Sequence, residues 1–250
     1  MLRSLRELRG YGIAATDGSI GDINDFLFDD RLWTLRYVVV DTGKWLPGRK
    51  VVIAPESIGR PDDSDRMLPV TLDRQRIKDG PDLEFHKPVS RQHEEAISSF
   101  YGWPRYWEAY PAGMAAAPLL TGAAPVQAAD DANFRDVPRG DPNLRSAREV
   151  EGYRIGAIDD AFGHVEDFFA DDEDWRIRYL LVDTRNWLPG RHVLIAQEWQ
   201  TGVDWSNEQV TVNLTKDEIK ESPPFDPATP IGREYETKLH EHYGRPVYWY

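Results

Sequence analysis

Short alternating segments separated by turn residues dominate the hydrophobic pattern of the chain. After the Asp17-Gly18 turn, apolar and polar side chains nearly alternate over residues 20–28, as in a strand with one buried face. Residues 33–41 (WTLRYVVVD) are β-branched and aromatic, which favours a central strand. Further strands are expected at residues 13–15, 50–53 and 67–72. Short strands at this spacing are typical of a small barrel or sandwich.

Helical signals follow these strands. A capping box runs from Thr215 to Glu218, and Asp73 begins the corresponding turn in the first half of the chain. Both predicted short helices end before a proline. The longer helix-compatible stretches are 90–100, followed by Gly102, and 230–242, followed by Gly244. Glycine is the residue that most often follows a helix end.

The chain contains an internal repeat. When the sequence is shifted by 142 residues, positions 1–108 align with 143–250 without a gap, and about 45 of the 108 pairs are identical. Chance identity from average residue usage is ~6–7%. The period is too long for a solenoid unit, so the chain is a duplicated domain.

Both copies carry the same sequence of motifs. A Gly-x-x-x-Asp-Phe segment (Gly21 to Phe26) leads to an acidic turn, a Trp, an aliphatic run into Asp-Thr, and Trp-Leu-Pro-Gly-Arg. This combination resembles the PRC-barrel family, named for the cytoplasmic part of the photosynthetic reaction-centre H subunit. The resemblance implies small β-barrels used for binding and assembly, with no known catalytic role for the barrel.

The expected fold is mainly β, with two tandem PRC-barrel-like domains, each followed by a short helical, aromatic-ended tail. The first repeat covers 1–108, with its barrel at about 1–82. The second covers 143–250, with its barrel at about 143–224. An Ala/Pro-rich linker, 109–142, joins them. The uncharged stretch 109–129 is interrupted by three prolines, so we expect a linker there and no membrane span.

Composition narrows the classes of function. Acidic residues outnumber basic ones 43 to 30, a net charge of −13, which disfavours nucleic-acid binding. The charge is uneven, because residues 1–125 hold 16 basic and 18 acidic residues, and residues 126–250 hold 14 and 25. The excess in the second half suits either a basic partner or solubility. The chain has no Cys, which excludes thiol chemistry. With no secretory signal, a cytoplasmic location is expected.

The acidic turns recur in both copies and are candidate ligands for a divalent cation. Such turns also use Asp to bond their own backbone, which is the commoner arrangement. The cation candidates are Asp25, Asp29, Asp30, Asp167, Asp171 and Asp172. The His240-Glu241-His242 cluster points its two imidazoles about 160° apart on a helix, which favours a solvated helix face over a metal site.

Aromatic and arginine side chains are the interface candidates, because these residue types most often anchor protein interfaces. Trp45 and Arg49, with Trp187 and Arg191, can instead form a hairpin corner. The tails end in Tyr106-Trp107 and Tyr248-Trp249, which must dock either on their own repeats or on another molecule.

No nucleophile, histidine or phosphate loop recurs in both copies, so we expect no catalytic residues and no cofactor. The predicted function is a non-catalytic protein-interaction or assembly module, with a protein partner or self-association. The alternative is a small-ligand or divalent-cation binding protein that uses the barrel mouth and the acidic turns.

Overall fold

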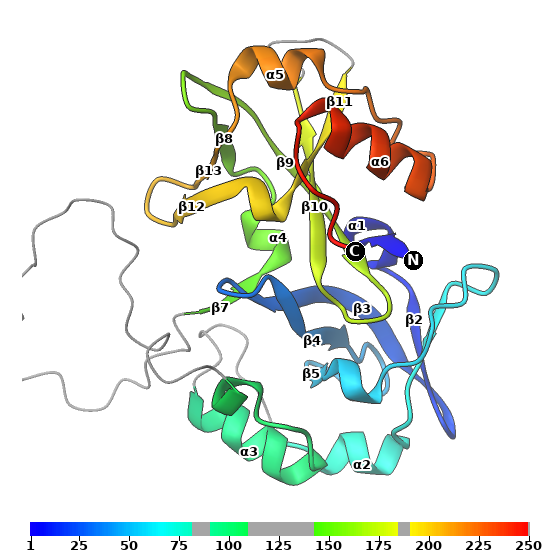
Figure 1. The fold of residues 1–250 in the computed structure, drawn as a ribbon. Coiled ribbons are helices and arrows are strands. Elements are labelled where there is room, and N and C mark those ends of the chain that lie inside the picture. The colour runs from blue at the N-terminus through cyan, green and yellow to red at the C-terminus, as the bar shows by residue number, and fades with distance from the viewer. Residues whose placement is uncertain (82–90, 110–142, 185–190, 250) are drawn as a thin grey trace, which may run out of the picture.

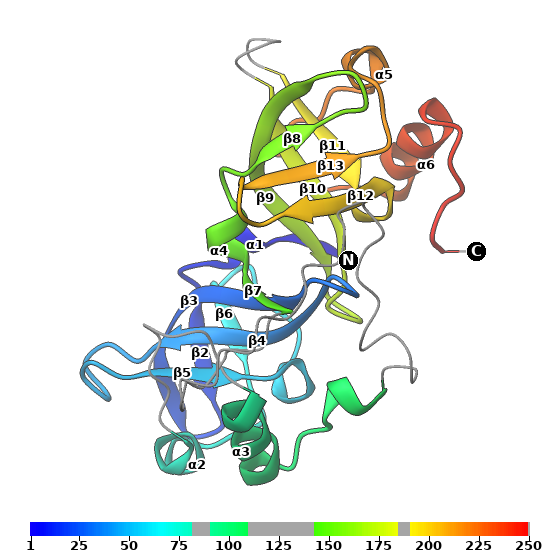
Figure 2. The same ribbon diagram turned by 90° about the vertical axis from the view of Figure 1, so that its left-hand side faces the viewer.

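The structure of the protein is a computed structural model that describes residues 1–81, 91–109, 143–184 and 191–249. Two mixed sheets, one for each repeat, stack one above the other in the view of Figure 1. The helices that follow the strands of the first repeat lie at one end of the molecule, and those of the second repeat lie at the other end and along the side of the second sheet (Figures 1 and 2).

The first sheet has the order β5-β4-β3-β2-β6. Its strands are β2 (Gly12–Ala15), β3 (Gly18–Asp29), β4 (Thr34–Asp41), β5 (Lys50–Ile53) and β6 (Met67–Pro69). Neighbouring strands are antiparallel except for the parallel pair β2–β6. The expected strands therefore form, with the β-rich segment 33–41 in β4 as a buried inner strand.

The second sheet repeats this arrangement with the order β11-β10-β9-β8-β13-β12. Its strands are β8 (Arg154–Gly156), β9 (Ala161–Asp171), β10 (Ile177–Asp183), β11 (His192–Ala196), β12 (Gln200–Asp204) and β13 (Gln209–Val212). Strand pairing closes neither sheet within the described residues. The mainly β character is confirmed, and the closed barrel stays a prediction.

Each sheet takes a strand from the other repeat. Strand β1 (Leu2–Ser4) pairs antiparallel with β9 of the second sheet, and β7 (Leu144–Ser146) pairs in the same way with β3 of the first. One-turn helices follow these strands, α1 (Leu5–Leu8) and α4 (Ala147–Val150). Both helices lie between the two sheets in Figures 1 and 2. The repeats thus exchange their first strands reciprocally.

The later helices match the sequence signals. They are α2 (Arg74–Asp79), α3 (Arg91–Tyr101), α5 (Lys216–Glu221) and α6 (Arg233–His242). The Thr215–Glu218 capping box is present at the start of α5, and the Asp73 side chain accepts from the Arg76 amide at the start of α2. Short 3₁₀ helices follow β5 and β11 and end the first tail, namely η1 (Pro55–Ser57), η4 (Gln197–Trp199) and η2 (Tyr106–Ala109).

Apolar side chains from both repeats form one buried cluster. Within it Phe28 and Trp33 of the first repeat meet Phe168 of the second, with the Phe28 and Phe168 ring centroids 5.9 Å apart. All three side chains are fully buried. Within the described residues, no helix is long and apolar enough to cross a membrane. The charge-free stretch at 109–129 falls, apart from Ala109, outside them.

Candidate functional site

The recurrent acidic residues lie at the strand exchange. The Asp167 carboxylate accepts hydrogen bonds from the Ser4 hydroxyl and the Arg6 amide of the other repeat, and from the amide of Phe168. Asp25 accepts the equivalent three bonds from the Ser146 hydroxyl and the Arg148 and Phe26 amides. These two aspartates therefore hold the start of α1 or α4, contributed by the opposite repeat.

Two further aspartates hold the cationic side chains of the exchanged strands. Asp30 accepts from Arg145 Nε at 3.0 Å, and Asp172 accepts from Arg3 Nε at 3.2 Å. The N-terminal ammonium of Met1 lies 2.5 Å from Asp172 Oδ1 and 3.3 Å from Asp171 Oδ1. Because charge-assisted bonds are stronger than neutral ones, these pairs fix the register of both strands.

The turns that follow β3 and β9 contact each other directly. Trp33 donates its amide to the Asp29 carbonyl, and Trp175 donates to the Asp171 carbonyl, each residue with a positive φ, +52° and +56°. Positive φ is unusual for a bulky side chain, so tertiary contacts must hold both turns. Each Trp carbonyl in turn accepts a hydrogen bond from a backbone amide of the opposite repeat. The Leu35 amide donates to the Trp175 carbonyl, and the Ile177 amide donates to the Trp33 carbonyl.

Burial changes the acidity of two of these carboxyls. Burial raises the pKa of Asp167 to about 6, although the bonds from Ser4, Arg6 and Phe168 oppose the increase. Burial also raises the pKa of Asp30 to about 6, against the effect of Arg145. For Asp172, burial acts in the same direction, but the bonds from the N-terminal ammonium and Arg3 outweigh it and lower the pKa.

The six cation candidates thus accept hydrogen bonds or ion pairs within the chain, and Asp29 does so from the Arg31 amide and the Arg36 guanidinium. In the described residues, no group of three or more His, Asp or Glu side chains is arranged to hold a metal ion. The acidic turns are better described as the joint between the repeats.

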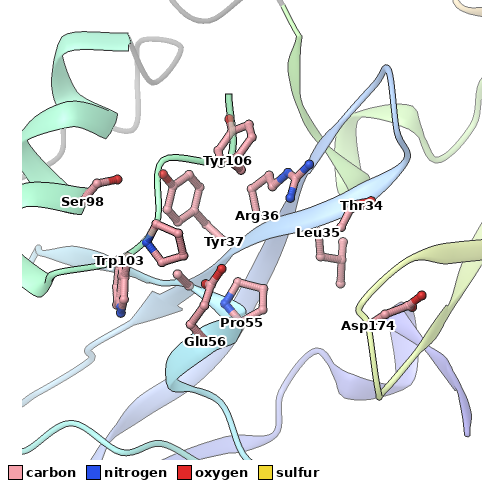
Figure 3. Close-up of a pocket in the computed structure, with 12 residues that line it drawn as sticks. Thr34, Leu35, Arg36, Tyr37, Pro55, Glu56, Ser98, Trp103, Tyr106 and Asp174 are labelled. Atoms are coloured by element: carbon pink, nitrogen blue, oxygen red, sulfur yellow. The ribbon is translucent and has the colours of Figure 1, made fainter. Parts of the chain in front are cut away.

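A small pocket forms where the tail of the first repeat packs on its sheet, and we call it the first tail pocket (Figure 3). Its lining includes Arg36, Glu56 and Tyr106. The Arg36 guanidinium stacks 4.1 Å above the Tyr106 ring, and the Tyr106 hydroxyl donates to the buried carboxylate of Glu94 at 2.6 Å. The first aromatic tail therefore docks on its own repeat.

An equivalent pocket, the second tail pocket, lies on the second repeat. It is lined by Arg178, Glu198 and Tyr248, which occupy the positions 142 residues after those of the first. Arg178 stacks 4.3 Å above the Tyr248 ring, and the Tyr248 hydroxyl donates to the buried Glu236 at 2.9 Å. The same arginine, tyrosine and buried glutamate are thus built twice.

The size of these pockets limits what they can hold. Their volumes are about 80 and 190 Å³, well below the ~300–1,000 Å³ of typical small-molecule sites. The lining of each pocket also includes an exposed glutamate, Glu56 or Glu198, while the half-buried arginines pair with Asp29 and Asp174. Each pocket suits a protruding side chain or a very small ligand, and neither has room for a large cofactor.

The Trp-Leu-Pro-Gly-Arg motif packs at the end of its own repeat. Arg49 donates to the carbonyl oxygens of Lys78 and Gly80 at the end of α2, and Arg191 donates to the Ser222 carbonyl at the end of α5. Cations favour helix C-termini, so the arginines act as helix caps. Trp45 is half-buried under Arg74, 5.0 Å from the ring centroid. Trp187 lies outside the described residues.

The two tail tryptophans are half-buried beside the tail pockets. Trp107 packs edge-on against Tyr106, with centroids 5.0 Å apart, and Trp249 lies beneath the Arg233 guanidinium at 4.3 Å. Both keep part of their rings accessible to solvent.

The expectation of a solvated face at the histidine cluster is wrong for His240, which is buried. Its Nε2 lies 2.9 Å from the Tyr179 hydroxyl and its Nδ1 lies 2.7 Å from the Pro246 carbonyl. His242 is exposed, as expected. The reason for the difference is that the returning tail covers one side of α6.

Several residues of these sites were missed at the sequence level. Ser4 and Ser146 cap α1 and α4 by accepting the amides of Glu7 and Glu149. The repeated Ser-x-x-Glu pattern was an available signal. The arginines and buried glutamates of the tail pockets are also identical in both copies, but no local pattern relates them to the tail tyrosines.

A scan against models of known protein families finds no match for the chain, and a search of curated proteins finds none.

Proposed function

We propose that the chain is a non-catalytic protein-interaction or assembly module built from two PRC-barrel-like repeats. The observation that carries the proposal is the duplication of the tail pocket. Each repeat presents a partly exposed Tyr-Trp tail beside a pocket whose lining includes an arginine and an exposed glutamate, while the acidic turns are occupied by the joint between the repeats. Duplicated surfaces suit a partner that is itself two-fold or that binds in two copies.

The barrel part of the proposal is supported by the first residue of the shared motif. A side chain at Gly21 would collide with the Asp41 carbonyl oxygen, and one at Gly163 would collide with the Asp183 carbonyl oxygen. Both glycines have positive φ, +141° and +51°. The motif thus allows β3 and β9 to cross closely over the next strand, the kind of coiling that a small barrel needs.

The interaction is tested by in-cell crosslinking of the full chain followed by mass spectrometry. The variants are Trp107→Ala, Trp249→Ala and the double substitution, with Ile158→Ala as the control because that side chain is 64% exposed and outside the tails. We expect a reproducible partner whose capture falls in each single variant, is lost in the double variant and is unchanged in the control.

Two results would contradict this function. One is the same crosslinks in the double variant as in the control, which would remove the tail pockets from the interaction. The other is the absence of a macromolecular partner together with turnover in a broad substrate screen, which would make the protein an enzyme.

A second candidate, a small-ligand protein, is favoured by the arginine and glutamate side chains that line each pocket. Because the pockets are equivalent, a ligand would bind two copies per chain. Native mass spectrometry of the purified protein, with elemental analysis, would show this stoichiometry, and Glu198→Gln would reduce it to one. An empty protein favours the interaction module.

A further inference from the structure

The joint between the repeats has the geometry of a two-fold interface. Leu2 lies opposite Asp171 in one ladder and Leu144 lies opposite Asp29 in the other. Leu2 and Leu144 are equivalent positions in the repeat, and so are Asp29 and Asp171. Each contact therefore occurs twice, with the roles of the two repeats exchanged. An interface of this kind normally joins two identical subunits.

The pseudo-two-fold axis passes between two residues of opposite charge. Arg9 and Glu151 occupy equivalent positions, and Arg9 Nη2 lies 2.5 Å from Glu151 Oε1. Their side chains are only 17% and 22% exposed. In a pairing of two first repeats, Arg9 would face a second Arg9, and in a pairing of two second repeats, Glu151 would face a second Glu151.

Equivalent positions of the helices and strands that pack at the joint differ in side-chain size. The helix α1 packs on β9, and α4 packs on β3. Of the helices, α1 carries the large Leu5 and α4 the small Ala147 at the same position. Of the strands, β3 carries the large Phe28 and β9 the small Ala170. All four side chains are buried. A pairing of like repeats would place both large residues, or both small ones, in the same helix–strand layer, which favours overpacking or cavities.

We propose that this joint is a recognition surface with built-in selectivity, by which a first repeat accepts a second repeat and rejects its own kind. The partner that fits the surface in trans is the opposite repeat of another copy of this chain. In the native chain the two repeats belong to one polypeptide. Covalent linkage gives an effective concentration on the order of 1 mM, so pairing within the chain dominates below that concentration.

This inference goes beyond the proposed function, because it holds whether or not the tail pockets bind anything. It is tested in the full chain with charge reversals. Arg9→Glu places two glutamates on the axis, and Glu151→Arg places two arginines there. When these two variants are mixed, however, each repeat finds an oppositely charged partner in the other chain.

The two variants are unfolded in denaturant and refolded separately or as an equimolar mixture, then examined by native mass spectrometry. We expect the mixture to form a dimer with one copy of each variant, at least tenfold more abundant than any dimer of either variant alone. The double variant R9E/E151R restores the opposite charges within one chain and should refold as a monomer, like the unmodified protein.

The neutral variants Arg9→Gln and Glu151→Gln are the control. They remove the ion pair without creating repulsion, so their mixture should form no excess of the mixed dimer. The proposal is overturned if the charge-reversed mixture stays monomeric or unfolded while R9E/E151R folds normally, or if its dimers show no preference for one copy of each variant.

Discussion

At the scale of single residues, the recurrent aspartates have a role that depends on the opposite repeat. Asp25 and Asp167 bond the backbone amide of the next residue, as acidic residues in turns often do, but they also accept a serine hydroxyl from the other half of the chain. Residue type and local spacing predicted the first bond. The second depends on a partner more than 120 residues away, which no local pattern indicates.

The first prediction concerns the pH dependence of stability. With its pKa raised to about 6, Asp167 binds a proton more tightly in the folded chain than in the unfolded one. Its protonation therefore stabilises the fold at low pH, and this stabilisation is lost as the pH rises through 6. For Asp167→Asn, which can keep the local hydrogen bonds, the change in unfolding free energy between about pH 7.5 and 5 should be smaller by about 1 kcal/mol.

Urea unfolding at the two pH values measures this difference. Asp204→Asn is the control, because this exposed carboxyl has a lowered pKa and titrates below the window. The same pH dependence in Asp167→Asn and the unmodified protein would show that the carboxyl is not the titrating group.

At the scale of elements, the sequence predicted those whose signals are local. The caps of α2 and α5 are where Asp73 and Thr215 indicated, and the helices α3 and α6 end before Gly102 and Gly244, both with positive φ. The exchanged strands β1 and β7 were missed. Each has three residues and gains its order from pairing with a distant strand, so hydrophobic periodicity cannot reveal it.

The second prediction separates the two interpretations of the Trp-Leu-Pro-Gly-Arg motif. Arg49→Met removes the bonds donated to the carbonyls at the end of α2. We expect a loss of about 1–3 kcal/mol in the free energy of unfolding. Amide hydrogen exchange at 74–79 should become faster, while partner crosslinks should remain. Arg60→Met, at a side chain that is 81% exposed, is the control and should change neither measurement.

An unchanged exchange rate in α2 combined with lost crosslinks would reverse this assignment. Arg49 would then be an interface residue, as Trp45-to-Arg49 was also interpreted from sequence alone.

At the scale of the whole molecule, the repeat predicted two similar units but not how they join. The offset of 142 residues relates every strand of the first sheet to one of the second, and the structure adds an exchange that makes each sheet incomplete without the other repeat. The shared ring cluster of Phe28, Trp33 and Phe168 points to the same dependence.

The third prediction is that the repeats stay together when the chain between them is cut. A protease site inserted after Gln127 allows the folded protein to be cleaved between the repeats. Because the joint combines two exchanged strands, buried rings and several ion pairs, the two fragments should co-elute at the mass of the uncut chain at about 10 µM protein.

The variant S4A/S146A loses the hydroxyl bonds to Asp167 and Asp25 and should, once cleaved, dissociate at lower urea concentration. Fragments that separate without urea would mean that the exchange does not hold the repeats together, and that the tether does.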